Sequence, residues 1–305
     1  VETVLSIQTL AKHYGKVEAL KGISFEISKG SIFGLLGPNG SGKTTTLGIL
    51  LGVIRAKSGS FSWFNGAPQK DSLKRIGAIL ETPNFYPYLS GEQNLKIVAD
   101  IKGVSYSHIE EVLELVKLNE RKKSAFKTYS LGMKQRLAIG AAMLNNPEVL
   151  VLDEPTNGLD PQGIAEVRNL IQAIAEKGTT IILASHLLDE VQKVCDQVAV
   201  LHQGKLLFKG KVSEVLEMGN QADFVELEAP DMKQLYEVIQ KFPGVKSLKK
   251  NAAGQMVVFF ESKPDVASLN QFLIGEGITL SHLAVKQQSL EKQFLALIQQ
   301  ATQQS

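Results

Sequence analysis

The sequence predicts an α/β fold built on a parallel sheet, followed by a smaller α+β domain. In the first two thirds of the chain, short runs that are apolar at every position alternate with segments of helical periodicity. This pattern is typical of a sheet covered by helices on both faces. Of the 26 glycines only four lie beyond Asn220, and a length of 305 residues suggests about two domains. We therefore expect a first domain at residues 1–219 and a second at residues 220–305.

The strands of the first domain are expected to be of two kinds. Ser24–Ile27 and Ser60–Phe64 alternate in polarity, and the turn residues Asn65-Gly66 follow the second segment, so we expect antiparallel hairpins there. Residues 92–118 carry apolar side chains at helical spacing. Buried strands of the parallel sheet are expected at four apolar runs: Ile32–Leu36, Ile76–Leu80, Val149–Leu152 and Thr180–Ala184.

The second domain is expected to have the β-α-β-β-α-β order of a ferredoxin-like fold. A further helix is expected at Leu290–Ile298, where apolar side chains form one stripe. The six elements of the domain are expected at Phe224–Glu228 (strand), Met232–Lys241 (helix), Val245–Lys249 (strand), Met256–Glu261 (strand), Val266–Ile274 (helix) and Ile278–Val285 (strand).

Composition excludes several classes of protein. The chain is 44% hydrophobic and 21% charged, which argues against a disordered or collagen-like protein. Its net charge of +2 indicates no bulk attraction to nucleic acid. The single Cys195 cannot form an internal disulfide. No apolar run approaches the roughly 18 residues of a membrane span, and the first residues lack a signal-peptide pattern, so any work at a membrane is expected to need a partner.

A phosphate-binding loop follows the first apolar run. Glycines let backbone N–H groups turn toward a phosphate, and a helix that begins there adds its positive end. Lys43 is expected to bridge the β- and γ-phosphates, and the Thr44 hydroxyl to bind Mg²⁺. Thr45, which opens the helical stretch Thr45–Leu51, is expected to bind nucleotide too. The motif G-x-x-x-x-G-K-[ST] is matched by Gly37, Pro38, Asn39, Gly40, Ser41, Gly42, Lys43 and Thr44.

Two adjacent carboxylates end another apolar run. Asp153 and Glu154 come directly after Val149–Leu152. Beside a phosphate-binding loop, this is the Walker B arrangement. Asp153 is expected to hold Mg²⁺, while Glu154 faces the γ-phosphate and polarises water.

With these two motifs, residues 4–218 resemble the ATP-binding subunit of ABC transporters. The resemblance implies a P-loop NTPase fold, with a RecA-like parallel core and antiparallel and helical subdomains. Tyr129–Leu137 is similar to the family signature Leu-Ser-Gly-Gly-Gln, with Ser130 and Gly132 retained. Leu131 and Met133 replace the first glycine and the glutamine. In the family, this segment contacts the γ-phosphate of ATP held by the other subunit, which gives Ser130 and Gly132 a nucleotide-binding role.

Four further residues receive roles from the same resemblance. Asp160, in Asn157-Gly158-Leu159-Asp160, is similar to the D-loop residue that communicates across the dimer, and it also suits a helix cap before Pro161. His186 resembles the switch histidine that contacts the γ-phosphate and orients water. Tyr14 resembles the aromatic residue that stacks on adenine, with Val17 beside the base; a core tyrosine is the alternative.

One position departs from the family pattern. The lid strand of the family normally ends in glutamine, and here Glu81 follows Ile76–Leu80. A carboxylate binds a hard cation more strongly than an amide does. A glutamate here is similar to a subset of bacterial exporters linked to self-protection against peptide antibiotics. We expect Glu81 to act as the lid residue, with catalytic and Mg²⁺-binding roles.

The resemblance implies an ATPase of the bacterial drug and antibiotic exporter branch. One chain carries one phosphate-binding loop and one signature, so the implied assembly is a homodimer closing over two MgATP. Its other partners are separate membrane-spanning subunits, which would place the chain peripherally on the cytoplasmic side of the membrane. The segment from Asn84 through Asn94–Lys102 is the expected surface for them, and no nucleic acid is expected. The competing hypothesis is an ABC-type ATPase acting on ribosomes or DNA. A P-loop kinase is more distant, because it has no role for Ser130 or His186.

Overall fold

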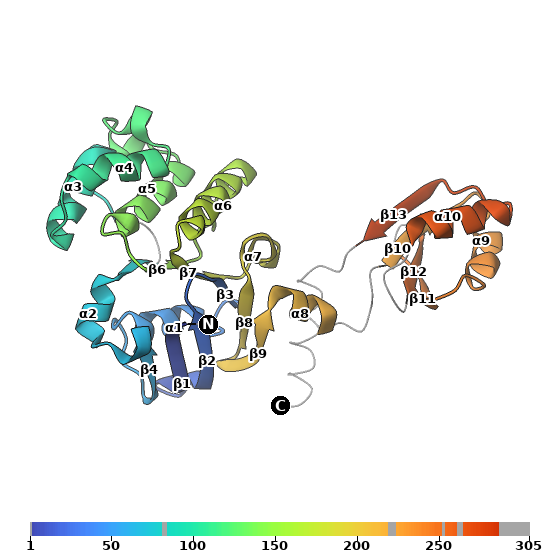
Figure 1. Ribbon diagram of the computed structural model, residues 1–305, viewed down its shortest axis with the longest axis horizontal. Helices are drawn as coiled ribbons and strands as arrows, with labels where there is room; N and C mark the ends of the chain where they lie inside the picture. The colour runs from blue at the N-terminus through green and yellow to red at the C-terminus, as the bar shows by residue number, and fades with distance from the viewer. Residues whose placement is uncertain (1, 81–83, 219–223, 252–253, 261–264, 287–305) are drawn as a thin grey trace. The chain divides into compact units, whose positions relative to one another are not determined.

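The computed structural model describes residues 2–80, 84–218, 224–251, 254–260 and 265–286. Contacts within the chain divide it into two compact units, Val1–Val212 and Ser213–Ser305. Each unit has its own sheets and helices (Figure 1). The expected boundary between residues 219 and 220 falls outside the described residues and stays a prediction.

A six-stranded sheet forms the centre of the first unit, in the order β5-β6-β7-β3-β8-β9. The strands from β5 to β8 pair in parallel, and β9 is antiparallel to β8. This confirms the parallel core predicted from the apolar runs. Every residue of β3, β6 and β7 is buried, as expected of strands covered on both faces. The bounds are β3 (Ile32–Leu36), β5 (Ile76–Ile79), β6 (Val149–Asp153), β7 (Thr180–Ser185), β8 (Gln197–His202) and β9 (Lys205–Lys211).

A three-stranded antiparallel sheet has the order β2-β1-β4. β1 (Thr3–Tyr14) and β2 (Val17–Ser28) form a hairpin, and β4 (Ser58–Trp63) pairs with β1. The expectation of antiparallel strands is confirmed, but the hairpin at Asn65-Gly66 is wrong. The indole N–H of Trp63 donates to the carbonyl of Leu50, and the chain then turns through η1 (Phe64–Gly66) into α2 (Gln69–Lys74).

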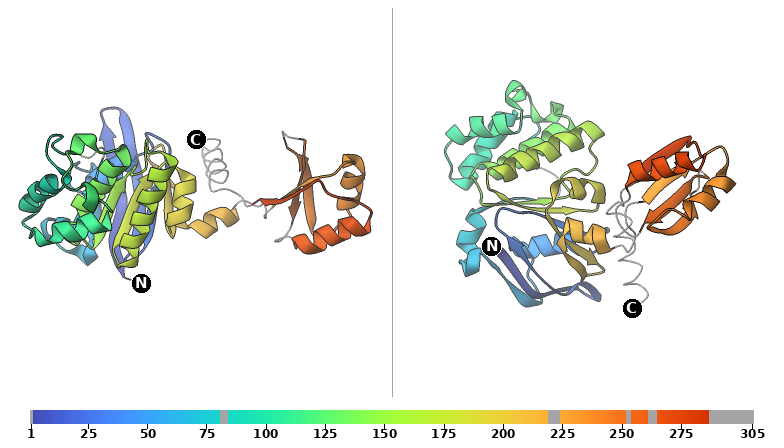
Figure 2. Two further views of the ribbon diagram at one scale, coloured as in Figure 1. Left: turned by 90° about the horizontal axis from the view of Figure 1, so that it is seen from above. Right: turned by 45° about the vertical axis from the view of Figure 1, so that its right-hand side comes forward.

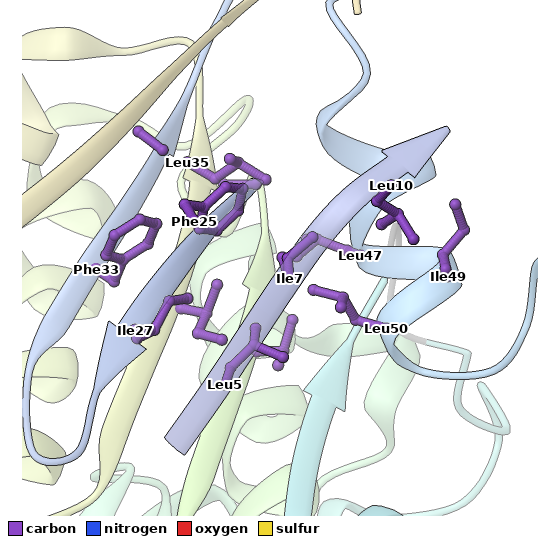
Figure 3. Packing of buried hydrophobic residues seen from close by; sticks show 14 of the residues in the cluster. Leu5, Ile7, Leu10, Phe25, Ile27, Phe33, Leu35, Leu47, Ile49 and Leu50 are labelled. Carbon is purple, nitrogen blue, oxygen red and sulfur yellow. The ribbon is translucent and has the colours of Figure 1, made fainter. Parts of the chain in front are cut away.

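The core of the first unit lies between this antiparallel sheet, the parallel sheet and α1 (Lys43–Leu50). Phe25 of β2 stacks on Phe33 of β3, with ring centroids 5.5 Å apart. Each large apolar side chain buried here stabilises the fold by roughly 1.5–3 kcal/mol. The strand before the phosphate-binding loop and the helix after it are therefore both held in one core. Figure 3 shows the packing of Leu5, Ile7, Leu10, Phe25, Ile27, Phe33, Leu35, Leu47, Ile49 and Leu50.

The other helices of the first unit cover the sheet and form the helical region (Figure 2). Residues 92–118 are helical as predicted, but in two pieces. Gly103 ends the first piece in a left-handed conformation (φ 66°) that favours glycine. The elements are α3 (Gly91–Lys102), α4 (Ser107–Leu115), η2 (Asn119–Arg121), η3 (Phe126–Thr128), α5 (Leu131–Met143), α6 (Pro161–Glu176) and α7 (Leu188–Val194). The helix α8 (Val212–Met218) begins at the last residue of the first unit and otherwise belongs to the second.

The second unit contains a four-stranded sheet in the order β11-β12-β10-β13, with every neighbouring pair antiparallel. This order confirms the ferredoxin-like prediction. The last strand begins at His282 rather than at Ile278, which is buried in the core instead. The helix expected at Leu290–Ile298 lies outside the described residues. The elements are β10 (Phe224–Glu228), α9 (Met232–Ile239), β11 (Val245–Lys250), β12 (Met256–Phe260), α10 (Val266–Gly275) and β13 (His282–Lys286).

Candidate active site

Three neighbouring strands bring the predicted site residues to one edge of the central sheet. β6, β7 and β3 are adjacent and parallel, so their carboxyl ends meet at the same edge. Gly37 follows β3, Asp153 ends β6, and His186 follows β7. The three motifs are far apart in sequence, and the strand order places them together.

The loop between β3 and α1 has the backbone that its glycines permit. A Cβ on Gly37 would collide with the Ser41 hydroxyl and the carbonyl of Leu201, so only glycine fits there. Gly42 has φ 111°, a conformation that side chains disfavour. The buried Ser41 hydroxyl has no hydrogen-bond partner among the described residues. Together with the amino end of α1, these features fit a phosphate group.

Lys43 points into the site from the first turn of α1. Its side chain is only 5% exposed, and Nζ donates a hydrogen bond of 2.7 Å to the carbonyl of Gly37. Nζ also lies 3.3 Å from Oε1 of Glu154. A buried ammonium group is held here by a carbonyl and a carboxylate, and phosphate oxygens are ligands of the same kind.

Thr44 and Asp153 form the candidate Mg²⁺ site. The Thr44 hydroxyl donates to Oδ2 of Asp153 over 2.7 Å. Hydroxyl and carboxylate oxygens are ligands that suit Mg²⁺. Within the described residues, no group of three His, Cys, Asp or Glu side chains could hold a metal by itself. A cation at this position would therefore depend on nucleotide oxygens and water for the rest of its coordination.

Glu154 is held between two cationic or hydrogen-bonding groups. Oε2 lies 2.8 Å from Nδ1 of His186, and Oε1 faces Lys43. The backbone of Glu154 has φ 47°, which is uncommon for a residue with a side chain. Its N–H donates to the carbonyl of Ala184 on β7. Strained backbone of this kind is often found at functional sites.

The phosphate-binding loop opens into a pocket of about 570 Å³. Tyr14 and Val17 face each other at the turn of the β1–β2 hairpin, and both line the pocket. Tyr14 is 47% exposed, so its ring is not a core side chain. Nζ of Lys12 lies 5.0 Å from the ring centroid. Of the residues predicted to bind nucleotide, Asn39, Gly40, Gly42, Lys43, Thr44 and Thr45 also line the pocket, as does Glu154.

Four residues that line the pocket were not predicted from the sequence: Glu18, Ala19, Lys21 and Gln203. Gln203 lies in the turn between β8 and β9, about 160 residues from the loop it faces. The turn is fixed by Gly204, whose N–H donates to the carbonyl of Ser41 and whose carbonyl accepts from the N–H of Lys21. A Gln-Gly pair between two apolar strands indicates a turn, but nothing local says which loop the turn will meet.

Ser130, Gly132 and Asp160 lie away from this pocket and do not line it. Ser130 caps the amino end of α5 by accepting from the N–H of Met133. Asp160 caps α6 by accepting from the N–H of Gly163. Leu131, which replaces a family glycine, is 45% exposed at the start of α5. Glu81 lies outside the described residues.

Comparison with known proteins identifies relatives of this chain. The profile of the family described as ABC transporter matches residues 20–157. The bacitracin transport ATP-binding protein BcrA of Enterococcus faecalis is 34% identical, over 98% of this chain and 97% of its own length. An uncharacterised ABC transporter ATP-binding protein of Bacillus subtilis, YdbJ, is 38% identical over 96% and 95%. The lantibiotic transport ATP-binding protein SrtF of Streptococcus pyogenes is 42% identical over 68% and 90%.

Solved structures of the same kind share the fold. The chain cbiO1 of Clostridium perfringens, part of the ABC transporter complex cbiONQ, matches with a TM-score of 0.65 and 27% identity, over 80% of this chain and 97% of that one. An ATP-binding subunit of an ABC transporter matches with a TM-score of 0.62 and 30% identity, over 70% and 92%. Among the described residues, no helix combines the length and the apolar character needed to cross a membrane.

Proposed function

This chain belongs to the ATP-binding subunits of ABC transporters, and we propose from that premise which residues bind and hydrolyse its ATP. The chain is an ATPase that powers transport together with separate membrane subunits. The competing hypothesis of a ribosome- or DNA-acting ATPase finds no support among its relatives. The observation that carries the assignment of residues is the Glu154 carboxylate, which lies between Lys43 and His186.

In the proposed site, Lys43 leaves the carbonyl of Gly37 to contact the β- and γ-phosphates. The N–H groups of residues 39–44 and the amino end of α1 surround the same phosphates. The ring of Tyr14 stacks on adenine, and Val17 packs beside it. Glu154 accepts a proton from the attacking water, and His186 positions that water and the γ-phosphate.

Mg²⁺ is proposed as the cofactor, held by Thr44 and Asp153. When bound, it would neutralise the charge that develops on the phosphate oxygens. The hydrogen bond between the Thr44 hydroxyl and Oδ2 of Asp153 supports this role, since it places two oxygen ligands together. Glu81 is proposed as a further ligand on the lid.

The active assembly is proposed to be a homodimer. Ser130 and Gly132 begin a helix whose amino end suits a phosphate, yet they do not line the pocket of their own chain. A second copy facing head to tail would bring its Ser130 and Gly132 to the γ-phosphate, and Asp160 to the interface. Binding of ATP would close the two copies together, and hydrolysis would let them reopen.

The membrane subunits are proposed to contact the surface around α3. A groove of about 350 Å³ lies between β5, α3 and α5, and the residues that line it include the apolar Ile79, Phe85 and Val98 and the polar Asn84 and Lys102. Tyr86 and Tyr88, in the segment before α3, are 61% and 80% exposed. Tyrosine is enriched at protein interfaces, so the two exposed tyrosines support this surface.

The transported substrate is proposed to be an antimicrobial peptide or a similar antibiotic, moved outward. This proposal rests on the relatives, since BcrA is a bacitracin transport protein and SrtF a lantibiotic transport protein. Cargo choice would belong to the membrane subunits. The chain itself would then work peripherally on the cytoplasmic side of the membrane, without contact with nucleic acid.

Glu154→Gln tests the assignment. It keeps the shape of the side chain but removes the base, so ATP should still bind while turnover falls by about 10²–10³-fold. Phosphate release and equilibrium ATP binding measure the two effects, with Glu111→Gln on α4 as the matched exposed control. Near-normal hydrolysis by Glu154→Gln would contradict the role of Glu154.

The same variant tests the partners. Tagged Glu154→Gln protein, trapped with ATP, is captured from detergent-solubilised membranes of its host and compared with Lys43→Ala, which should not be trapped. A multi-span membrane protein recovered in near-equal amount is the expected result. Ribosomal or DNA-repair proteins without a membrane protein would overturn the proposal.

A further inference from the structure

A groove of about 470 Å³ lies in the second unit, between α9 and the strands β11 and β12. β11 is the outermost strand on its side of the sheet, so among the described strands only β12 pairs with it. We call this the α9–β11 groove. Its size lies within the range of pockets that hold small molecules. It belongs to a different unit from the ATP site, so the inference does not depend on the proposed function.

The wall of the α9–β11 groove is apolar and adaptable. Met232 and Tyr236 lie one helical turn apart on α9, Leu248 comes from β11, and Met256 comes from β12. Met256 is only 5% exposed and forms the floor, whereas Tyr236 is 50% exposed. Methionine side chains adjust to irregular shapes and make favourable contacts with aromatic rings. The wall therefore suits a flat or flexible apolar body.

Of these apolar side chains, Met256 belongs to the core of the unit, Met232 and Leu248 pack against that core, and Tyr236 stands outside it. Leu235, Val238 and Ile239 are the residues of α9 buried in that core. Met232 is only partly buried against it, and Tyr236 stands on the neighbouring, exposed stripe of the helix. An exposed tyrosine above a buried methionine leaves apolar surface available to a ligand.

The charges around the groove favour an anion. Lys233, Lys249 and Lys250 contribute to the lining, against the single carboxylate of Glu237. Nζ of Lys249 lies 5.4 Å from the ring centroid of Phe259. Along β12, Met256, Val258 and Phe260 pack under the helices, and Phe259 points to the opposite face of the sheet. The ammonium group of Lys249 is therefore on the face away from the groove. The ammonium groups available to a ligand in the groove are therefore those of Lys233 and Lys250. Neither makes an ion pair or side-chain hydrogen bond with any residue that the structure describes.

We propose that the α9–β11 groove binds a small amphipathic anion, with an apolar or aromatic body and one carboxylate or similar group. The body would lie on Met232, Tyr236 and Met256, and the acid would meet the ammonium groups of Lys233 and Lys250. The side chains of Lys233, Lys250 and Glu237 together carry one net positive charge. The groove therefore selects a single negative charge over a multiply charged ligand or a cation.

The test uses the full chain and three probes of one shape: 2-naphthoate, its neutral alcohol 2-naphthalenemethanol, and its cation 2-naphthylmethylammonium. Calorimetric titration should give the tightest binding for naphthoate, by about tenfold over the neutral probe, since each exposed charge pair adds only modestly. Equal binding of all three probes, or no naphthoate binding, would overturn the proposal.

Substitutions in the groove test whether the probes bind there. The double variant Lys233→Gln/Lys250→Gln should lose the preference for naphthoate and keep the affinity for the alcohol. Tyr236→Ala should weaken both probes, and Tyr236→Phe should restore them. These side chains are exposed, so folding should be unaffected. Lys241→Gln, an exposed lysine outside the lining, and Tyr14→Ala at the ATP pocket are the controls. Loss of naphthoate binding in Tyr14→Ala, or unchanged binding in the double variant, would refute the assignment.

Discussion

Nδ1 of His186 lies 2.8 Å from Oε2 of Glu154. The two residues are 32 positions apart, at the ends of the adjacent strands β7 and β6. The hydrogen bond leaves Nε2 of the ring available to another partner, and it fixes the carboxylate that the proposed mechanism uses as a base. One contact therefore joins the group that would position water to the group that would take its proton.

His186→Ala and His186→Asn separate the two roles of this histidine. The amide nitrogen of asparagine can replace Nδ1 and keep the hydrogen bond to Glu154, but nothing replaces Nε2. If Nε2 contacts the γ-phosphate, both variants should bind ATP and lose about 10²-fold in turnover. Phosphate release under saturating ATP measures this. Normal turnover in His186→Asn would mean that the histidine acts only by positioning Glu154.

Thr44→Val should raise the Mg²⁺ concentration needed for half-maximal activity, because it removes the hydroxyl that bonds Asp153. Thr44→Ser keeps that hydroxyl and should stay close to the wild type. A Mg²⁺ titration of ATP hydrolysis compares the three proteins. If Thr44→Val shifted the titration no more than Thr44→Ser does, loss of the hydroxyl would have no effect of its own, and the ligand role of Thr44 would be wrong.

How far the sequence alone predicts this molecule depends on whether a feature is local. The loop at Gly37–Thr44, the carboxylates Asp153 and Glu154, and the helix start at Ser130 are each encoded in a short segment, and the structure places each where the segment predicts. The apolar runs also predict the parallel strands, because burial on both faces removes polar residues.

Features that depend on distant contacts could not be predicted in this way. Gln203 reaches the ATP pocket only because the backbone of Gly204 forms hydrogen bonds with the backbones of Ser41 and Lys21. No residue near Gln203 in the sequence indicates these contacts. Asn65-Gly66 has the residues of a hairpin turn, yet burial of Trp63 against α1 directs the chain into α2. In both cases tertiary packing decided among locally acceptable conformations.

Mixing two inactive variants tests the composite dimer site. Lys43→Ala lacks the phosphate-binding lysine, and Ser130→Arg blocks the helix start that would face the partner's ATP. A mixed dimer contains one site in which both residues are intact, so activity should return when the two proteins are combined. Each variant alone is the control. No recovery in a mixture shown to contain mixed dimers would contradict a site shared between copies.

The last prediction concerns Lys102, which joins α3 to the end of α5. Its Nζ donates to the carbonyls of Ala141 and Ala142 and to Oδ1 of Asn145, over 2.7–3.0 Å. Burial lowers the pKa of Lys102 from 10.5 to about 8. Between these two values the unfolded chain holds a proton that the folded chain has released, so the free energy of unfolding should rise with pH.

Lys102→Arg is the matched variant, because arginine stays charged throughout this range. The unfolding free energy of the wild type minus that of Lys102→Arg should increase by on the order of 1–3 kcal/mol between about pH 7 and about pH 10. Urea titrations followed by tryptophan fluorescence measure it for the first unit alone, since the one tryptophan, Trp63, lies there. Both proteins carry every other titrating group, so those contributions cancel in the difference. Parallel pH curves for the two proteins would show that Lys102 keeps its charge when the first unit folds, and that the three oxygens around Nζ offset the cost of burying it.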